Sequence, residues 1–163
     1  MKKLLLFLFL LVSILSYGQE TTTFILVRHA EKVADGTKNP ALTEAGIMRA
    51  NKLLELFESA DISAIYSTDF DRTQMTVAPL ATAMDMNILS YGWNDPKGLL
   101  SELLSKHSGG TIVISGHSNT TPVLANLLLG KQRLEQFDDA DHSNILVVTT
   151  SELGKGKLLH LRF

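Results

Sequence analysis

Short apolar runs alternate along the chain with longer segments whose apolar residues recur every three or four positions. The short runs are typical of buried strands, and the longer spacing is typical of helices. Strands are predicted at 22–27, 64–67, 87–90, 111–115, 145–150 and 157–162. Helices are predicted at 44–57, 72–84, 96–107 and 122–129. This alternation favours an α/β fold with a largely parallel sheet and helices on both faces.

Individual residues refine these helices. Thr43 is a good N-cap for the first helix, whose apolar face is expected to contain Ile47, Leu53, Leu54 and Phe57. In the second helix, Pro79 is expected to kink or break the chain, because proline lacks the backbone N–H that a helix interior uses. The last helix is expected to have Thr121 as its cap, to start at Pro122 and to end at Gly130.

The N-terminal segment has the pattern of a secretory signal peptide. Lys2 and Lys3 precede an apolar run over 4–15, which ends at the small residues of Ser16-Tyr17-Gly18. The run is shorter than the roughly 20 residues that a spanning helix needs. We therefore expect cleavage after Gly18, export to the periplasm or the medium, and no stable membrane insertion of the remaining chain. An uncleaved anchor and a buried helix are the alternatives. Residues 19–163 are expected to form one domain.

Composition narrows the possible functions. The formal charge is −2 for the whole chain, and removal of two lysines with the signal peptide would leave −4. A mildly acidic chain without a Lys/Arg run is not expected to bind nucleic acid. The chain has no cysteine, so disulfides, thiolate catalysis and zinc–cysteine sites are excluded.

Polar side chains gather where three of the predicted strands end. Arg28 and His29 end the first, Arg72 follows the second, and His117 follows the fourth. Because the carboxyl ends of parallel strands meet at one edge of a sheet, these side chains are expected to share a crevice. Arginine forks match phosphate oxygens, and a neutral imidazole is a nucleophile near pH 7. The pattern therefore indicates a phosphate site in which a histidine can attack phosphorus.

Several short motifs extend this prediction to a known family. The chain resembles the histidine phosphatase superfamily, the phosphoglycerate-mutase-like group, in its short form. The resemblance covers nearly all of 22–163 and implies a three-layer α/β/α sandwich with a mostly parallel central sheet. Its motifs are Arg28-His29-Ala30, Leu42-Thr43-Glu44-Ala45-Gly46, Tyr66-Ser67-Thr68 with Arg72-Thr73, and Gly116-His117-Ser118. Ala30 stands where the usual Arg-His-Gly triplet has glycine.

The resemblance also implies roles for single residues. His29 would be the nucleophile that becomes phosphorylated, Arg28 and Arg72 would clamp the phosphoryl group, and His117 would complete the pocket and donate to it. The family uses no metal or other cofactor, and the partner is a small phosphorylated substrate. Ser118 and Asn119 directly follow His117, so they are further candidates for phosphoryl contacts, although both are also common at helix starts.

The proton donor is the least defined part of the site. Many family members carry an acidic residue between the second Arg and the second His, but residues 90–103 lack the Leu-Arg-Glu element of the mutases. Asp95 and Glu31 are the candidates, and Asp95 could instead be an ordinary turn residue before Pro96. A weak or missing acid suits a good leaving group, such as that of phosphohistidine or a phosphoanhydride.

Three alternatives to a phosphatase for small phosphate monoesters stay open. The first is a phosphatase for phosphohistidine or an envelope glycan, since specificity depends on the loops at 33–40, 90–98 and 131–142. The second is a phosphate-binding relative without turnover. The third, a metal-dependent hydrolase, needs a carboxylate–histidine ligand set, and 138–142 is better interpreted as a solvated acidic turn with His142 as a loop residue.

Overall fold

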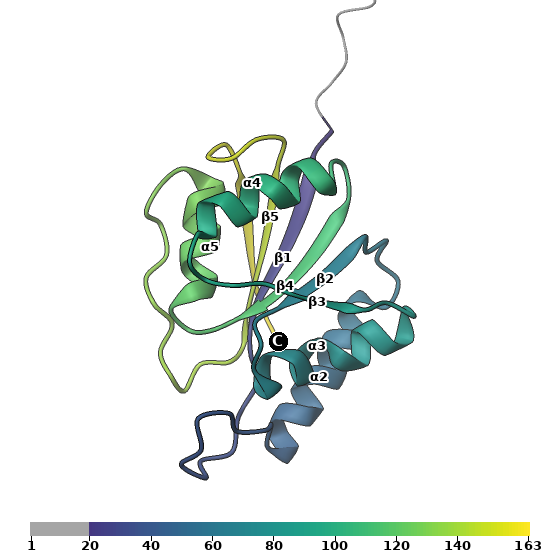
Figure 1. Ribbon diagram of the computed structural model, residues 1–163, viewed down its shortest axis with the longest axis vertical. Coiled ribbons are helices and arrows are strands. Elements are labelled where there is room, and N and C mark those ends of the chain that lie inside the picture. Colours follow the sequence, from purple (N-terminus) through teal and green to yellow (C-terminus); the bar gives the residue numbers. More distant parts are fainter. Residues whose placement is uncertain (1–19) are drawn as a thin grey trace, which may run out of the picture.

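The computed structural model describes residues 20–163, so the predicted signal peptide and its cleavage point lie outside the described residues. One six-stranded sheet forms the centre of the fold (Figure 1). Its strands are β1 (Thr22–Arg28), β2 (Ala64–Ser67), β3 (Ile88–Ser90), β4 (Thr111–Gly116), β5 (Asn144–Thr150) and β6 (Lys157–Arg162). They are arranged in the order β3-β2-β4-β1-β5-β6. The first four in this order pair in parallel, and β5 and β6 add two antiparallel pairings.

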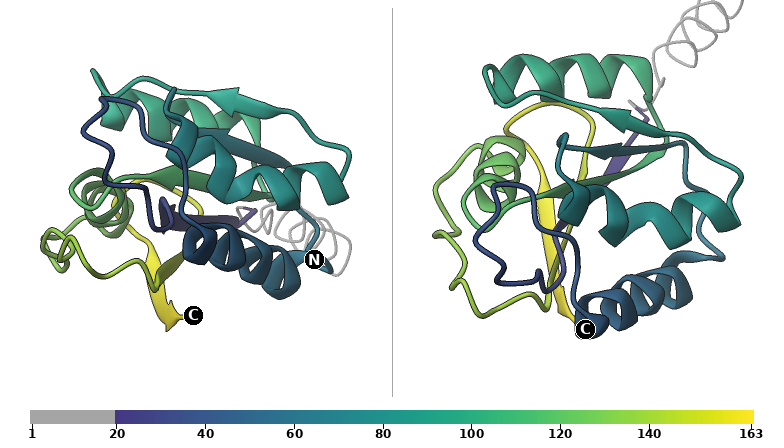
Figure 2. Two further views of the ribbon diagram at one scale, coloured as in Figure 1. Left: turned by 90° about the horizontal axis from the view of Figure 1, so that it is seen from below. Right: turned by 60° about the horizontal axis from the view of Figure 1, so that its bottom comes forward.

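Four helices complete the described fold: α2 (Glu44–Phe57), α3 (Asp71–Ala83), α4 (Pro96–Lys106) and α5 (Thr120–Leu129). Helices α2 and α3 lie together on one side of the sheet, and α4 and α5 lie on the other (Figures 1 and 2). This arrangement confirms the three-layer α/β/α sandwich with a mostly parallel sheet.

Strand β1 explains why the sheet is covered on both faces. Phe24 and Leu26 belong to the apolar core that includes residues of α4 and α5, whereas Ile25 and Val27 belong to the core that includes residues of α2 and α3. Successive side chains of a strand point to opposite faces, so a continuous apolar run has to be buried twice. The strand therefore lies in the interior of the sheet, between β4 and β5. Its last residue lies at the edge of the sheet where the parallel strands end.

The predicted apolar face of α2 is partly wrong. Thr43 does cap the helix, and its hydroxyl accepts a hydrogen bond from the N–H of Gly46 at 3.1 Å. The buried residues of the helix, however, are Gly46, Ala50 and Leu53, and Ile47 is 47% exposed. Gly46 lies against the backbone of Glu31, after the end of β1, and Ile47 next to it faces solvent.

Two helix details also differ from the sequence prediction. Helix α3 runs through Pro79 without the break that was one of the two predicted outcomes, and the kink stays a prediction. Helix α5 starts at Thr120 after Asn119, one residue earlier than the cap predicted at Thr121. Gly130 ends α5 as predicted, with a φ of 67° in the left-handed region that glycine adopts without strain.

Within residues 20–163, no helix has both the length and the apolar character needed to cross a lipid bilayer.

Candidate active site

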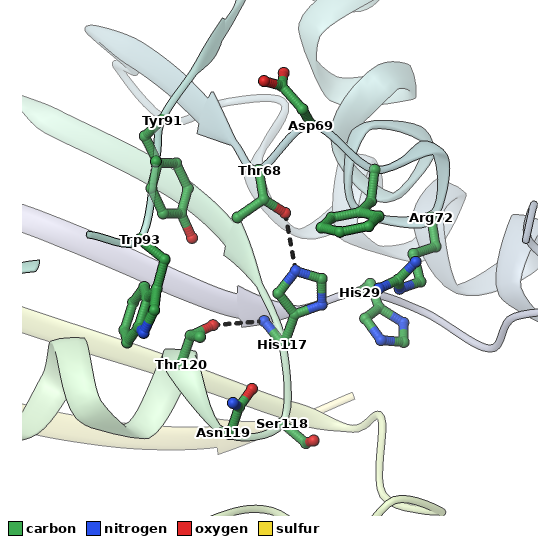
Figure 3. A pocket seen from close by; sticks show the side chains of 12 residues that line it. His29, Thr68, Asp69, Arg72, Tyr91, Trp93, His117, Ser118, Asn119 and Thr120 are labelled. Carbon is green, nitrogen blue, oxygen red and sulfur yellow. Dashed lines mark hydrogen bonds between the residues drawn. The ribbon is translucent and has the colours of Figure 1, made fainter. Parts of the chain in front are cut away.

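A pocket of about 600 Å³ opens at the carboxyl ends of the parallel strands (Figure 3). Register explains why these ends meet: Arg28 pairs with Gly116 of β4, and Ser67 of β2 pairs with Ser115. The pocket is lined by His29, Thr68, Asp69, Phe70, Arg72, Tyr91, Gly92, Trp93, His117, Ser118, Asn119 and Thr120. The structure thus brings together both predicted histidines and one of the two predicted arginines in the lining.

His29 is held in one tautomer. Its side chain is 4% exposed, and its Nδ1 lies 2.8 Å from the carbonyl oxygen of Ala30. A carbonyl can only accept, so Nδ1 carries the proton and Nε2 keeps its lone pair. The neighbouring backbone is fixed as well, because the N–H of Ala30 donates to Thr76 Oγ1 at 2.8 Å. The geometry therefore leaves the lone pair of Nε2 available for a reaction.

Both pocket histidines are neutral at physiological pH. Burial, more than any other effect, lowers the pKa of His29 to about 3, and the nearby charge of Arg28 acts in the same direction. Burial also lowers the pKa of His117 to about 4, with Arg72 contributing. An unprotonated imidazole is the form that can attack phosphorus.

His117 lies opposite His29, with a distance of 5.6 Å between the ring centroids. Its Nε2 lies 3.0 Å from Thr68 Oγ1, and its backbone N–H donates to Thr120 Oγ1 at 2.9 Å (Figure 3). Thr68 itself is anchored by Thr73, whose hydroxyl lies 2.9 Å away. Two threonines from different elements therefore fix the second histidine.

Arg72 has donors that no described residue uses. Its Nε and Nη1 are buried and have no hydrogen-bond partner among residues 20–163, and its Cζ lies 4.2 Å from the centre of the Phe70 ring. Burial lowers the pKa of this guanidinium, which nevertheless stays charged. A buried charged donor without a partner is costly, so a group of this kind is expected to bind an anion.

Arg28 has a different environment from Arg72. Its Nη1 donates to the carbonyl oxygens of Asp138 and Asp141, at 2.8 and 3.1 Å. Its Nη2 lies 3.5 Å from the carboxylate of Asp139, and its buried Nε has no partner among the described residues. Arg28 is not among the lining residues, so it holds the 138–141 loop behind the pocket. Its role in clamping phosphate stays a prediction.

Ser118 and Asn119 both line the pocket, as the sequence predicts for residues that touch the substrate. The Ser118 hydroxyl donates to Asp139 Oδ1 at 3.1 Å. The acidic loop therefore contacts both Arg28 and Ser118.

Neither candidate proton donor lies in the pocket lining. Asp95 is the N-cap of α4, and its carboxylate accepts from the N–H of Gly98 at 2.8 Å. Glu31 forms an ion pair with Arg49 at 2.7 Å, and this arginine holds the pKa of Glu31 below its usual value. The structure gives both carboxylates structural partners instead of a place beside the leaving group.

Several site residues were missed by the sequence analysis. Asp69, Phe70, Tyr91 and Trp93 line the pocket without having been assigned a role. They follow the ends of β2 and β3, so the rule that ligands bind at the carboxyl ends of parallel strands could have indicated them. Asp69 is the only acidic residue in the lining, and its carboxylate accepts from the Ser90 hydroxyl and points away from the histidines in Figure 3.

His142, which the sequence analysis interpreted as a loop residue, contacts His29. Its Nδ1 lies 2.8 Å from the backbone oxygen of His29, and the two rings are 5.6 Å apart. The hydrogen bond ties the segment before β5 to the backbone of His29.

Comparisons with known proteins agree with this picture. Residues 24–91 match the family model of the histidine phosphatase superfamily (branch 1). A comparison with curated proteins found no significant match.

Solved structures share the fold at low sequence identity. A mycobacterial glucosyl-3-phosphoglycerate phosphatase is 13% identical with a TM-score of 0.70, over 87% of this chain and 99% of that one. The protein histidine phosphatase SixA, complexed with tungstate, is 14% identical with a TM-score of 0.70, over 86% and 96%. A phosphoserine phosphatase mutant from Entamoeba histolytica is 17% identical with a TM-score of 0.68, over 86% and 96%. The family match supports the predicted resemblance for residues 24–91, which include Arg28, His29 and Arg72, and the solved structures show that the fold is shared.

Proposed function

We propose that this protein is a phosphatase that hydrolyses a small phosphorylated compound through a phosphohistidine intermediate on His29. One observation carries the proposal: the hydrogen bond from His29 Nδ1 to the carbonyl oxygen of Ala30 leaves Nε2 free, in a pocket where two donors of Arg72 have no partner among residues 20–163. The match of residues 24–91 to the histidine phosphatase superfamily supports it.

The reaction follows from the positions of these groups. The unpartnered nitrogens of Arg72 bind oxygens of the phosphoryl group, and His117 donates to them once the dianion raises the proton affinity of its ring. Nε2 of His29 attacks phosphorus, the bond to the leaving group breaks, and the leaving group takes the electron pair. Water then attacks the phosphohistidine, which releases phosphate and restores neutral His29. Fixed positive groups stabilise the charge in both steps and supply most of the acceleration.

The leaving group departs with little help from a carboxylic acid. Asp95 and Glu31 have other partners, and Asp69 points away from the histidines. General acid catalysis contributes about 100- to 10,000-fold where a positioned acid exists. A substrate whose leaving group is stable as an anion needs that contribution least. The proposal therefore favours such a substrate over a simple alkyl phosphate.

Phosphate release from phenyl phosphate, measured with a chelator present, tests the proposal. We expect the purified protein to turn over and the His29→Ala variant to lose activity. His107→Gln is the matched control. His107 lies at the opposite end of the sheet, where its backbone oxygen accepts from Thr22 at the start of β1. Turnover that survives in His29→Ala would overturn the mechanism, and turnover that the chelator abolishes would favour a metal-dependent hydrolase.

Trapping the intermediate separates catalysis from simple binding. Acid-quenched mass spectrometry should find one phosphoryl group on His29, and the modification should be labile to acid and stable to base. Vanadate that binds without any turnover of phenyl phosphate would instead indicate a phosphate-binding relative that does not catalyse.

We also propose that the protein is exported, because residues 1–18 have the charge and apolar pattern of a signal peptide. The protein recovered from the producing cells should begin at Gln19. A chain that retains Met1 or Lys2 and stays with the membrane fraction would favour an uncleaved anchor.

A further inference from the structure

We infer that the natural substrate carries its phosphoryl group on a flat, uncharged aromatic ring. This inference rests on the proposed function, because it names the leaving group of the same reaction. It comes from the aromatic walls of the pocket and from the distribution of charge around them.

Aromatic side chains form the walls beside the phosphoryl-binding groups. Phe70, Tyr91 and Trp93 all line the pocket, and the labelled rings of Tyr91 and Trp93 lie next to each other in Figure 3. Tyr91 is 7% exposed, and its hydroxyl donates to the carbonyl of Ser115 at 3.2 Å. Since that proton is already used, Tyr91 offers a ligand its ring and an acceptor oxygen, but not a donor. Trp93 is half-buried, so part of its ring is open to a ligand.

Phe70 connects these walls to the phosphoryl site. Arg72 covers one face of its ring at 4.2 Å, and His117 meets the ring edge-on with centroids 5.2 Å apart. These two contacts hold Phe70 in place. The residue is still 36% exposed, so part of its ring is open to a ligand. A ring bonded to the phosphoryl group would therefore lie against a prearranged aromatic surface, which lowers the entropic cost of binding.

Charge in the pocket disfavours an anionic leaving group. Arg72 is the only lysine or arginine in the lining, and its free donors are those that the phosphoryl oxygens need. Asp69 lies in the lining, and Asp139 reaches Ser118 from the neighbouring loop. A second negative group on the substrate would meet Asp69 and find no cation besides Arg72 among the lining residues. The volume of about 600 Å³ is sufficient for a phosphoryl group and one ring.

The aromatic contact is tested with two substrates that both have good leaving groups. Phenyl phosphate carries a ring and acetyl phosphate does not. We expect Trp93→Leu to lower the ratio of kcat/KM for phenyl phosphate to that for acetyl phosphate by about tenfold, mainly through KM. Phe57→Leu is the matched control, because Phe57 packs on the α2 side of the sheet. An unchanged ratio in Trp93→Leu would overturn the inference.

The charge is tested with phenyl phosphate and 4-carboxyphenyl phosphate. The carboxylated compound has the better leaving group, yet we expect the wild type to prefer phenyl phosphate by about tenfold in kcat/KM. Asp69→Asn should reduce this preference by about threefold, since it removes the carboxylate that lines the pocket. A wild-type preference for the carboxylated compound would contradict the inference.

Failure of this inference is distinguishable from failure of the proposed function. If acetyl phosphate and phenyl phosphate are both hydrolysed in a manner that depends on His29, but Trp93→Leu affects them equally, the phosphatase proposal stands and the aromatic substrate is wrong. If no substrate shows turnover that depends on His29, the proposed function itself is wrong.

Discussion

The Nδ1 atom of His29 lies 2.8 Å from the carbonyl oxygen of Ala30, the residue that follows it. Residue 30 is alanine where the related motif has glycine, and the surrounding packing accommodates its methyl group. Ala30 is fully buried and packs with Leu42 and Ala50 in a small apolar cluster. The methyl group therefore packs in this cluster, and the carbonyl oxygen of the same residue still accepts the hydrogen bond that orients the imidazole of His29.

Stability should depend on pH through the two pocket histidines. Their pKa values, about 3 for His29 and about 4 for His117, lie below the value near 6.5 of an unfolded chain. Between these values the unfolded chain binds more protons than the folded one. Their contribution to stability is therefore complete above about pH 6.5 and is lost as the pH falls toward 4 and then 3. Urea unfolding at a series of pH values measures this loss.

A direct titration gives the control for this prediction. NMR of the imidazole nitrogens should show both rings neutral at about pH 5 in the free protein. The variant His29→Gln cannot titrate at this position, so its stability should fall less between neutral and acid pH. A folded-state pKa near 6.5 for His29 would contradict the prediction.

Arg72 should be sensitive even to a change that keeps its charge. Its Nε and Nη1 have no partner among residues 20–163 and belong to a rigid planar group whose spread of donors lysine cannot reproduce. We expect Arg72→Lys and Arg72→Ala both to lower kcat/KM for phenyl phosphate by about 100-fold or more, with the larger loss in the alanine variant. Inhibition by vanadate should weaken in the same order. Full activity in Arg72→Lys would show that only its charge is needed.

Asp95 can be tested as a helix cap and as an acid with two variants. Asp95→Asn keeps an acceptor for the N–H of Gly98, so stability and activity should change little. Asp95→Ala removes the cap and should lower the free energy of unfolding by about 1 kcal/mol. Thermal unfolding and turnover of phenyl phosphate check both expectations. A folded but inactive Asp95→Asn variant would restore Asp95 as the proton donor.

Gly46 should tolerate no side chain. A Cβ at this position would lie 2.2 Å from the backbone oxygen of Glu31, which also accepts from the N–H of Thr43 at 2.8 Å. Gly46→Ala should therefore push α2 away from the segment after β1 and destabilise the fold by roughly 1–3 kcal/mol. Gly92→Ala is the matched control, because its Cβ would meet no atom within 4 Å. Equal thermal unfolding midpoints for the two variants would contradict this prediction.

The fold and the centre of the site could be predicted from short-range patterns. Apolar runs such as Phe24 to Val27 require burial on both faces, and this favours a largely parallel sheet between helices. Parallel strands then place their carboxyl ends together, so His29, Arg72 and His117 had to meet. These predictions succeeded because each depends on the residues of one strand and on a general rule of topology.

The other features depend on which partner reaches a residue from a distant part of the chain. Arg49 is 18 positions away from Glu31 and takes this carboxylate into an ion pair. His142 reaches the backbone of His29 from 113 positions away. The exposure of Ile47 depends on how closely Gly46 approaches Glu31, which no periodicity in α2 encodes. Local sequence carries no signal for contacts of this kind.

Arg28 holds the acidic loop mainly through two backbone carbonyls, those of Asp138 and Asp141. Every residue type has such a carbonyl, so the anchor does not depend on the side chains of the loop. Substitutions there can accumulate during evolution without detaching the loop from the pocket edge. One arginine would then let the side chains of the loop, and with them the substrate preference, change while the reacting groups stay in place.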